Sequence, residues 1–309
     1  MKWSAWAVFA LLGVLWGSAW VLTPVTSSPR LLDGSVRFAI AAVVLGLLAR
    51  FQFIKRISRF QAFQLVPSIV LGVTMTGLPY ALAVWARGAV SQGMVPVFYA
   101  AMPLAALFFS RKADGADIPA MAIGMGGVAC LAGQAINFSS GQIYGMLLLG
   151  AAVLLGAFSL NYGKARIRPG SILLSSAIQC AVASILLVCL SGASGQLHRT
   201  SWQAIWNLQS IVQPFALAVA EAASLPLLYW LLTGIESWQA ATLQWIVTLT
   251  SVAEAAWVLR ARPTLQMTAG AAAVIAAVLW VMRQGSGPQT VTLQITSKLQ
   301  SRLDASNLK

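Results

Sequence analysis

The fold class of this chain is decided at residues 118–163, which read IPAMAIGMGGVACLAGQAINFSSGQIYGMLLLGAAVLLGAFSLNYG. This stretch has no charged residue. It is long enough for two bilayer-crossing helices, each of which needs about 20 apolar residues. A neutral turn, NFSSG at residues 137–141, divides it into two parts. The stretch therefore predicts two consecutive membrane-spanning helices, 116–135 and 142–162, joined by a short loop.

The composition of the whole chain points the same way. Of its 309 residues, 59% are hydrophobic and 9% are charged, whereas a soluble domain carries about 25% charged residues. Because so few charges cannot cover so much apolar surface, the composition excludes a soluble enzyme, a coiled coil, a disordered chain and a disulfide-stapled secreted domain. The three cysteines lie inside apolar runs and there is a single histidine, so we expect no disulfide framework, no metal site and no cofactor.

Apolar runs separated by short polar segments continue on both sides of this stretch. They are too long for barrel strands and lack the two-residue alternation of a barrel wall, so we expect helices. The predicted fold class is an all-α polytopic membrane protein with ten transmembrane helices. Besides the two above, the expected helices are 4–23, 31–50, 62–86, 91–110, 170–190, 211–233, 239–259 and 264–283.

The net charge of +13 comes from 20 Lys and Arg against 7 Asp and Glu. In a soluble protein this excess would suggest a nucleic acid partner. Here the basic residues lie between the apolar runs, so we expect no nucleic acid. Most of them fall on one side of the membrane if the N-terminus is cytoplasmic, and the positive-inside rule then places both termini in the cytoplasm.

A weak internal repeat divides the chain into halves. SLP at residues 224–226 matches GLP at 77–79. We expect a first five-helix repeat over 1–136, a second over 137–284, and a polar cytoplasmic tail over 285–309. Because five is an odd number, the second repeat is inserted upside down relative to the first. Inverted repeats let a transporter open alternately to each side of a central site.

Four short motifs carry a resemblance to a known family. They are LWGS at 15–18, VRF at 36–38, the proline-containing run 71–110, and VAEAAW at 252–257 followed by RPT at 262–264. Over residues 4–283 the chain resembles the drug/metabolite transporter superfamily, in its ten-helix EamA-type branch. It departs from that pattern where SRK stands at 110–112 and RARPT at 260–264, because both lack the acidic residue usual in the family.

The resemblance implies a carrier of the bacterial inner membrane, most often an exporter of amino acids or similar small metabolites. Aromatic amino-acid exporters are the closest functional analogue. The implied partners are a small-molecule substrate and the lipid bilayer. An efflux carrier or facilitator for nucleosides, drugs or amines is the alternative. Weaker alternatives are a channel, a lipid flippase and an intramembrane enzyme, because the expected spans contain only isolated polar residues.

Glu221 is the most informative single residue, because it falls near the middle of the expected helix 211–233. A carboxyl group at that depth is costly unless it faces the protein interior or water. It is a candidate for proton coupling in a transport cycle and for binding a substrate ammonium group. The other interpretation is a neutral glutamate that is hydrogen-bonded to a neighbouring helix for packing.

Two further charged residues, Arg37 and Glu254, fall toward the predicted outer ends of their helices. We expect them to form an ion pair at an outer gate. Arg37 is also a candidate ligand for a substrate carboxylate. Asp33 offers Arg37 a different partner, one turn earlier on the same helical face.

Several aromatic residues lie within the expected spans, away from the membrane interfaces where Trp and Tyr usually gather. Rings with a polar group can line a cavity and stack on an organic substrate, although such residues also serve as ordinary packing. Gln92 and Gln244 add amide groups. The candidate substrate-binding residues are Trp16, Arg37, Tyr80, Tyr99, Glu221 and Trp245.

Small residues cluster on two of the expected helices, at Gly124, Gly126 and Gly127 on one and at Gly270, Ala271, Ala272 and Ala273 on the other. Small side chains permit close helix packing. We expect these faces to form a rigid scaffold within the chain or a homodimer contact, rather than a substrate site.

Overall fold

The computed structural model describes residues 3–22, 30–54, 62–90, 94–110, 117–132, 140–196, 208–258 and 264–284. Within these ranges the chain is helical and has no strand, which confirms the all-α prediction. The predicted tail 285–309 and Gln92 lie outside the described residues.

Each of the ten predicted runs coincides with helix, and the third, fourth and ninth are divided into shorter pieces. The first-half elements are α1 (Trp3–Leu22), α2 (Arg30–Ile54), η1 (Ala62–Gln64), α3 (Leu65–Leu71), η2 (Gly72–Gly77), α4 (Leu78–Ala86), α5 (Met94–Tyr99), α6 (Met102–Ser110) and α7 (Asp117–Ala132). The second-half elements are α8 (Ser140–Arg166), η3 (Pro169–Ser171), α9 (Ile172–Ala193), α12 (Leu208–Leu232), α13 (Ser237–Ala241), α14 (Leu243–Val258) and α15 (Leu265–Gln284).

Six helical segments in the described ranges are long and apolar enough to cross a membrane. They are Leu31–Phe51, Leu65–Ala86, Gly141–Arg166, Pro169–Ala193, Phe215–Leu232 and Leu265–Arg283. Shorter apolar helices occur at Ala5–Ala19 and Ile118–Leu131. By length and composition these segments are compatible with a transmembrane protein.

Large apolar side chains cover much of the outside of the helix bundle. Val43 on α2, Leu147 on α8 and Ile185 on α9 are 62%, 68% and 64% exposed. In water such surfaces would be unfavourable by about 25 cal/mol per Å² of apolar area, whereas lipid chains accept them without that penalty. The exposed faces of the helices therefore have the chemistry of a lipid-facing surface.

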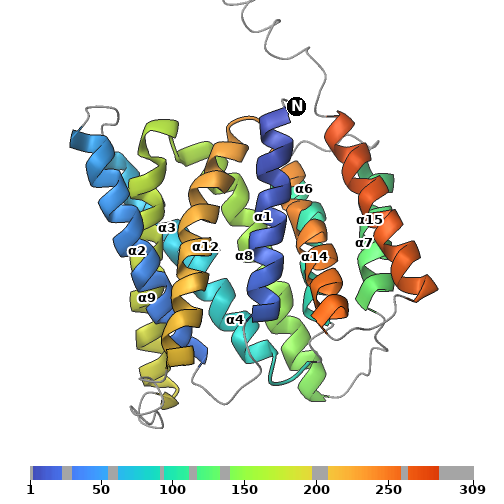
Figure 1. Cartoon of the computed structure of the whole chain (residues 1–309), viewed down its shortest axis with the longest axis horizontal. Coiled ribbons are helices and arrows are strands. Elements are labelled where there is room, and N and C mark those ends of the chain that lie inside the picture. The colour runs from blue at the N-terminus through green and yellow to red at the C-terminus, as the bar shows by residue number, and fades with distance from the viewer. Residues whose placement is uncertain are drawn as a thin grey trace, which may run out of the picture.

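The helices pack in pairs that join the two halves of the chain (Figure 1). α2 lies along α9 at one edge of the bundle, and α7 lies along α15 at the other. Between these edges, α1 packs on α12 and α14, while α8 packs on α4 and α6. The interior is therefore built from contacts between helices that are far apart in the sequence.

Glycine permits the closest of these contacts. A Cβ atom placed on Gly127 of α7 would lie 2.9 Å from the carbonyl oxygen of Gly270 on α15, and one on Gly270 would lie 2.7 Å from the carbonyl oxygen of Gly127. Gly127 and Gly270 therefore meet inside the chain and let α7 approach α15 closely, whereas Gly124 faces Trp245 of α14. A homodimer contact through such faces stays a prediction.

The third run changes its helical geometry in the middle of the bundle. The Leu78 N–H donates to the carbonyl oxygen of Val73, five residues earlier, which is the π-helical spacing of η2. Pro79 follows directly and has no N–H to restore the ordinary ladder at this point. Gly72 brings the segment close to α9, because a Cβ there would lie 2.9 Å from the carbonyl oxygen of Gln179.

Candidate functional site

A cavity of about 200 Å³ lies among these helices. Residues from both halves of the chain line it. They lie on α1, α2, η2, α4, α5 and α6 in the first half and on α8, α12, α13 and α14 in the second. The polar and charged groups on its wall are Trp16, Arg37, Thr76, Tyr80, Arg87, Tyr99, Glu221 and Gln244. The rest of the lining is apolar, as small-molecule sites usually are.

Five of the six candidate substrate-binding residues lie on this wall: Trp16, Arg37, Tyr80, Tyr99 and Glu221. Trp245 does not line the cavity. Its side chain is fully buried, its indole Nε1 donates to the carbonyl oxygen of Ala100 at 2.9 Å, and its ring lies against Gly124. The structure therefore places Trp245 in the packing between α14, α5 and α7, because the glycine leaves room there for its ring.

Arg37 of α2 and Glu221 of α12 are brought together on the cavity wall, because these two helices pack on each other. The guanidinium Nη2 and the carboxylate Oε2 are 4.0 Å apart, and the two side chains are 11% and 16% exposed. The guanidinium also lies 4.9 Å from the centre of the Phe38 ring and 5.1 Å from that of Tyr80. These two rings meet edge to face at 5.6 Å, so Arg37 is held by aromatic surfaces as well as by charge.

Gly34 explains how Tyr80 reaches this position. A Cβ atom on Gly34 would lie 2.7 Å from Cζ of Tyr80, so a larger residue would overlap the tyrosine ring. Glycine lets the ring of Tyr80 lie directly against the α2 backbone, one turn before Arg37. The local sequence of α2 thereby positions the aromatic ring that packs on the guanidinium.

The hydrogen-bonding capacity of the pair is largely unused. Within the described part of the chain, the Arg37 guanidinium donates no hydrogen bond, and its buried Nε has no partner. The Glu221 carboxylate likewise accepts none from the described residues. A guanidinium has five N–H donors, and a buried charge needs partners to offset the loss of water. Both groups can therefore bind a polar solute in the cavity.

The structure does not pair Glu254 with Arg37 as the sequence predicted for an outer gate. Ser18 on α1 donates to Oε1 of Glu254 at 2.6 Å, whereas Arg37 pairs with Glu221. The packing explains the difference, because α14 lies on α1 while α2 lies on α9 and α12. The described residues also include no ion pair between Arg37 and Asp33, which is exposed.

Arg87 is a wall residue that lies directly after the predicted helix 62–86 and was not among the candidate binding residues. It follows Thr76, Tyr80 and Ala83 at steps of four, three and four residues, and all four line the cavity. That spacing places them on one helical face. The helical periodicity of the third run, extended past its charge-free end, could have identified Arg87.

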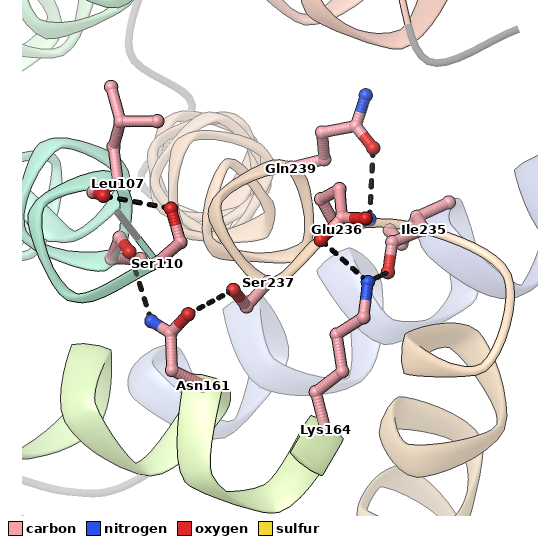
Figure 2. A network of polar contacts seen from close by, with 9 residues as sticks. Leu107, Ser110, Asn161, Lys164, Ile235, Glu236, Ser237 and Gln239 are labelled. Carbon is pink, nitrogen blue, oxygen red and sulfur yellow. Dashed lines mark hydrogen bonds and ion pairs between the residues drawn. The ribbon is translucent and has the colours of Figure 1, made fainter. Parts of the chain in front are cut away.

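A second polar cluster joins α8 to α6 and to the start of α13 (Figure 2). Asn161 donates through Nδ2 to the Ala106 carbonyl oxygen at 2.9 Å and accepts from the Ser237 hydroxyl at 2.5 Å. Lys164 lies 2.8 Å from the Glu236 carboxylate and donates to the Ile235 carbonyl oxygen at 2.7 Å. Figure 2 shows Asn161 and Lys164 projecting from α8 toward these partners.

Metal-binding chemistry is not indicated by the described residues, which contain no group of three His, Cys, Asp or Glu side chains able to hold an ion.

Comparison with known proteins supports the fold and leaves the family open. No family model matches the chain. Protein PagO of Salmonella typhimurium (strain LT2) is 24% identical over 188 residues, which span 58% of this chain and 61% of PagO. A solved structure described only as "Crystal structure of protein" aligns with a TM-score of 0.64 at 14% identity, over 91% of this chain and 99% of that one. At that identity the likeness shows a shared fold and no more.

Proposed function

We propose that this protein is a secondary transporter of the bacterial inner membrane that exports amino acids or similar small metabolites. The solute binds in the central cavity, and the protein opens to the two sides of the membrane in turn. The observation that carries this proposal is the pair of opposite charges, Arg37 and Glu221, on the cavity wall. A carrier rather than an enzyme is proposed, since the described residues of the wall offer binding groups and no pair of a nucleophile with a neighbouring base.

An amino acid complements this pair in charge. Its carboxylate matches the planar donors of Arg37, and its ammonium group matches the Glu221 carboxylate. A cavity of about 200 Å³ favours a compact solute, since sites for drug-sized ligands occupy roughly 300–1,000 Å³. The rings of Trp16 and Tyr99 and the side chain of Met102 supply part of the apolar surface of the wall.

We also propose ten membrane spans arranged as two inverted five-helix repeats, as in the EamA-type branch of the drug/metabolite transporters. The packing pattern supports this. If α2 corresponds to α9 and α7 to α15, each edge of the bundle is a contact of one element with its own counterpart. The packing of α1 on α12 and α14 then corresponds to that of α8 on α4 and α6. Repeats related by a two-fold axis in the membrane plane produce such reciprocal contacts.

The orientation in the membrane is proposed from the sequence. The Lys and Arg distribution favours a cytoplasmic position for the first residue of α1 and for the last of α15. Solute binding from the cytoplasm and release outside would follow from the cycle of an exporter. Glu221 is the candidate for coupling this cycle to protons, because it is the carboxylate on the cavity wall.

The charge of the wall argues against a carrier for organic cations. An amine without a carboxylate brings a positive charge to Arg37 and no anionic group that the guanidinium can bind. A neutral nucleoside likewise offers the guanidinium no carboxylate. These classes serve as competing substrates in the test below.

The experiment is counterflow in liposomes that contain the purified protein. Labelled amino acids, amines and nucleosides are tested at two pH gradients. The proposal predicts saturable counterflow for at least one amino acid and weaker or no exchange for the amines. Flux without saturation would indicate a channel, and exchange confined to amines or nucleosides would contradict the proposed substrate class.

A further inference from the structure

We propose that Asn161, Lys164, Glu236 and Ser237 form a latch that closes the cavity at the end of the bundle where α8 ends. The role of the latch in transport rests on the proposed function. Its role as a closure does not, because it follows from where these residues lie relative to the cavity.

On α8 the latch continues the face that lines the cavity. Ala152, Gly156 and Leu160 are wall residues spaced four apart, which places them on one side of the helix. Lys164 is the next residue at that spacing, and Asn161 follows Leu160 directly. Because α8 ends at Arg166, the latch occupies the last turn between the cavity and that end of the bundle.

The partners on two other elements lie one turn beyond the cavity in the same direction. Met102 of α6 is a wall residue, and Ala106, whose carbonyl oxygen accepts from Asn161, is one turn further along. Ala240 of α13 is a wall residue, and Ser237 is one turn before it. Three helices that line the cavity, α8, α6 and α13, are therefore tied together one turn beyond it by the contacts that Figure 2 draws.

Asn161 and Lys164 join α8 to different elements at this end of the bundle. The Asn161 amide bridges α6 and α13, since it donates to Ala106 and accepts from Ser237. Lys164 binds the turn between α12 and α13 through the Ile235 carbonyl oxygen and the Glu236 carboxylate. Each contact links elements that must separate before a solute can pass this end.

The chemistry of the latch allows it to open. The Lys164 and Glu236 side chains are 30% and 38% exposed, so their ion pair is partly solvated and contributes modestly to stability. Water can replace each of its hydrogen bonds when the helices separate. A fully buried ion pair would be far harder to break. The latch is therefore suited to repeated opening and closing.

Thiol labelling tests the latch without a solute. The full-length chain is used with Cys130, Cys180 and Cys189 replaced by alanine and with Leu160→Cys on the cavity wall. A membrane-impermeant thiol reagent is added to sealed vesicles from the side where α8 ends. We expect slow labelling with the latch intact. Lys164→Glu or Glu236→Lys should raise the labelling rate at least tenfold, and the double charge swap should return it toward the slow rate.

The matched control is Arg168→Glu, which reverses a charge at the same end of the bundle outside the latch. Its guanidinium lies over the Phe63 ring at 4.6 Å. This variant should leave the labelling rate unchanged. If a charge reversal prevents folding, Ser237→Ala removes one hydroxyl and should still raise the rate at least threefold.

Two results would overturn the latch: fast labelling of Leu160→Cys from that side in the intact protein, or a rate unaffected by the Lys164, Glu236 and Ser237 substitutions. Absence of counterflow together with latch-dependent labelling would instead overturn the proposed transport and leave the closure in place. The two proposals therefore fail separately.

Discussion

The Arg37 guanidinium on α2 and the Glu221 carboxylate on α12 face each other at 4.0 Å across one wall of the central cavity. This separation is too long for a hydrogen bond, so the two groups attract each other while their donors and acceptors stay available. A solute that carries both charges can occupy both groups at once. The predictions below rest on this relationship and on the residues that maintain it.

Glu221→Gln keeps the shape of the side chain and removes its charge and its titration. Loss of a charge-assisted hydrogen bond of about 1.5–3 kcal/mol should raise the KM for a transported amino acid at least tenfold. If Glu221 couples transport to protons, the dependence of initial rates on the pH gradient should also disappear. Unchanged rates and unchanged pH dependence in this variant would contradict both roles.

Arg37→Lys retains the positive charge and loses the planar donor set that stacks on aromatic rings. A lysine ammonium cannot bind a carboxylate with two parallel hydrogen bonds, so we expect KM to rise roughly tenfold while the protein still folds. Arg50→Lys, at an exposed position on the same helix, is the matched control. The prediction fails if both variants transport like the natural protein.

Gly34→Ala should disturb the site without touching a charged group. The added methyl overlaps the Tyr80 ring, so we expect a loss of about 1–3 kcal/mol in stability and a raised KM as Tyr80 and Arg37 shift. Gly46→Ala on the same helix is the control, because a Cβ there meets nothing within 4 Å. It should be neutral or stabilising by up to about 1 kcal/mol. Thermal unfolding in detergent and transport kinetics together distinguish these outcomes.

Trp245→Phe should separate packing from binding. It removes the Nε1 donor of the buried hydrogen bond to Ala100, which should lower stability by about 1–3 kcal/mol. KM should stay unchanged, because the ring is off the cavity wall. Trp230→Phe, at a 43% exposed position, serves as the stability control. A raised KM with unchanged thermal stability would contradict the packing role and indicate that Trp245 contributes to substrate binding.

Helix positions were predictable from the sequence because the apolar runs are long and almost free of charge. The divisions in the third run were not, since they depend on how closely Gly72 and Gly77 approach α9 in three dimensions. Arg37 and Glu221 were identified as candidates one by one, but not as a pair. The sequence suggested Glu254 or Asp33 as the partner of Arg37, whereas only the packing of α2 against α12 brings Glu221 to it.

The aromatic candidates show the same limit. Trp16 and Trp245 are both mid-span tryptophans, and nothing in the sequence separates them. One lines the cavity and the other fills the space above Gly124. Whether a tryptophan lines the cavity or packs in the core depends on the helix face that it occupies and, for Trp245, on a glycine far away in the sequence.

The assignment of Arg37 to the carboxylate and of Glu221 to the ammonium group of the solute is tested by measuring dissociation constants with the purified protein and its variants. L-Phenylalanine is compared with phenethylamine, which lacks the carboxylate, and with 3-phenylpropionate, which lacks the ammonium group. The account predicts that each analogue binds the natural protein at least tenfold more weakly than phenylalanine. In Arg37→Met, phenethylamine should bind as tightly as phenylalanine, because the partner of the carboxylate is gone. In Glu221→Gln, 3-phenylpropionate should bind as tightly as phenylalanine, because the partner of the ammonium group is gone. The assignment would be contradicted if removing the carboxylate or the ammonium group from the solute weakened binding to both variants as much as it weakens binding to the natural protein.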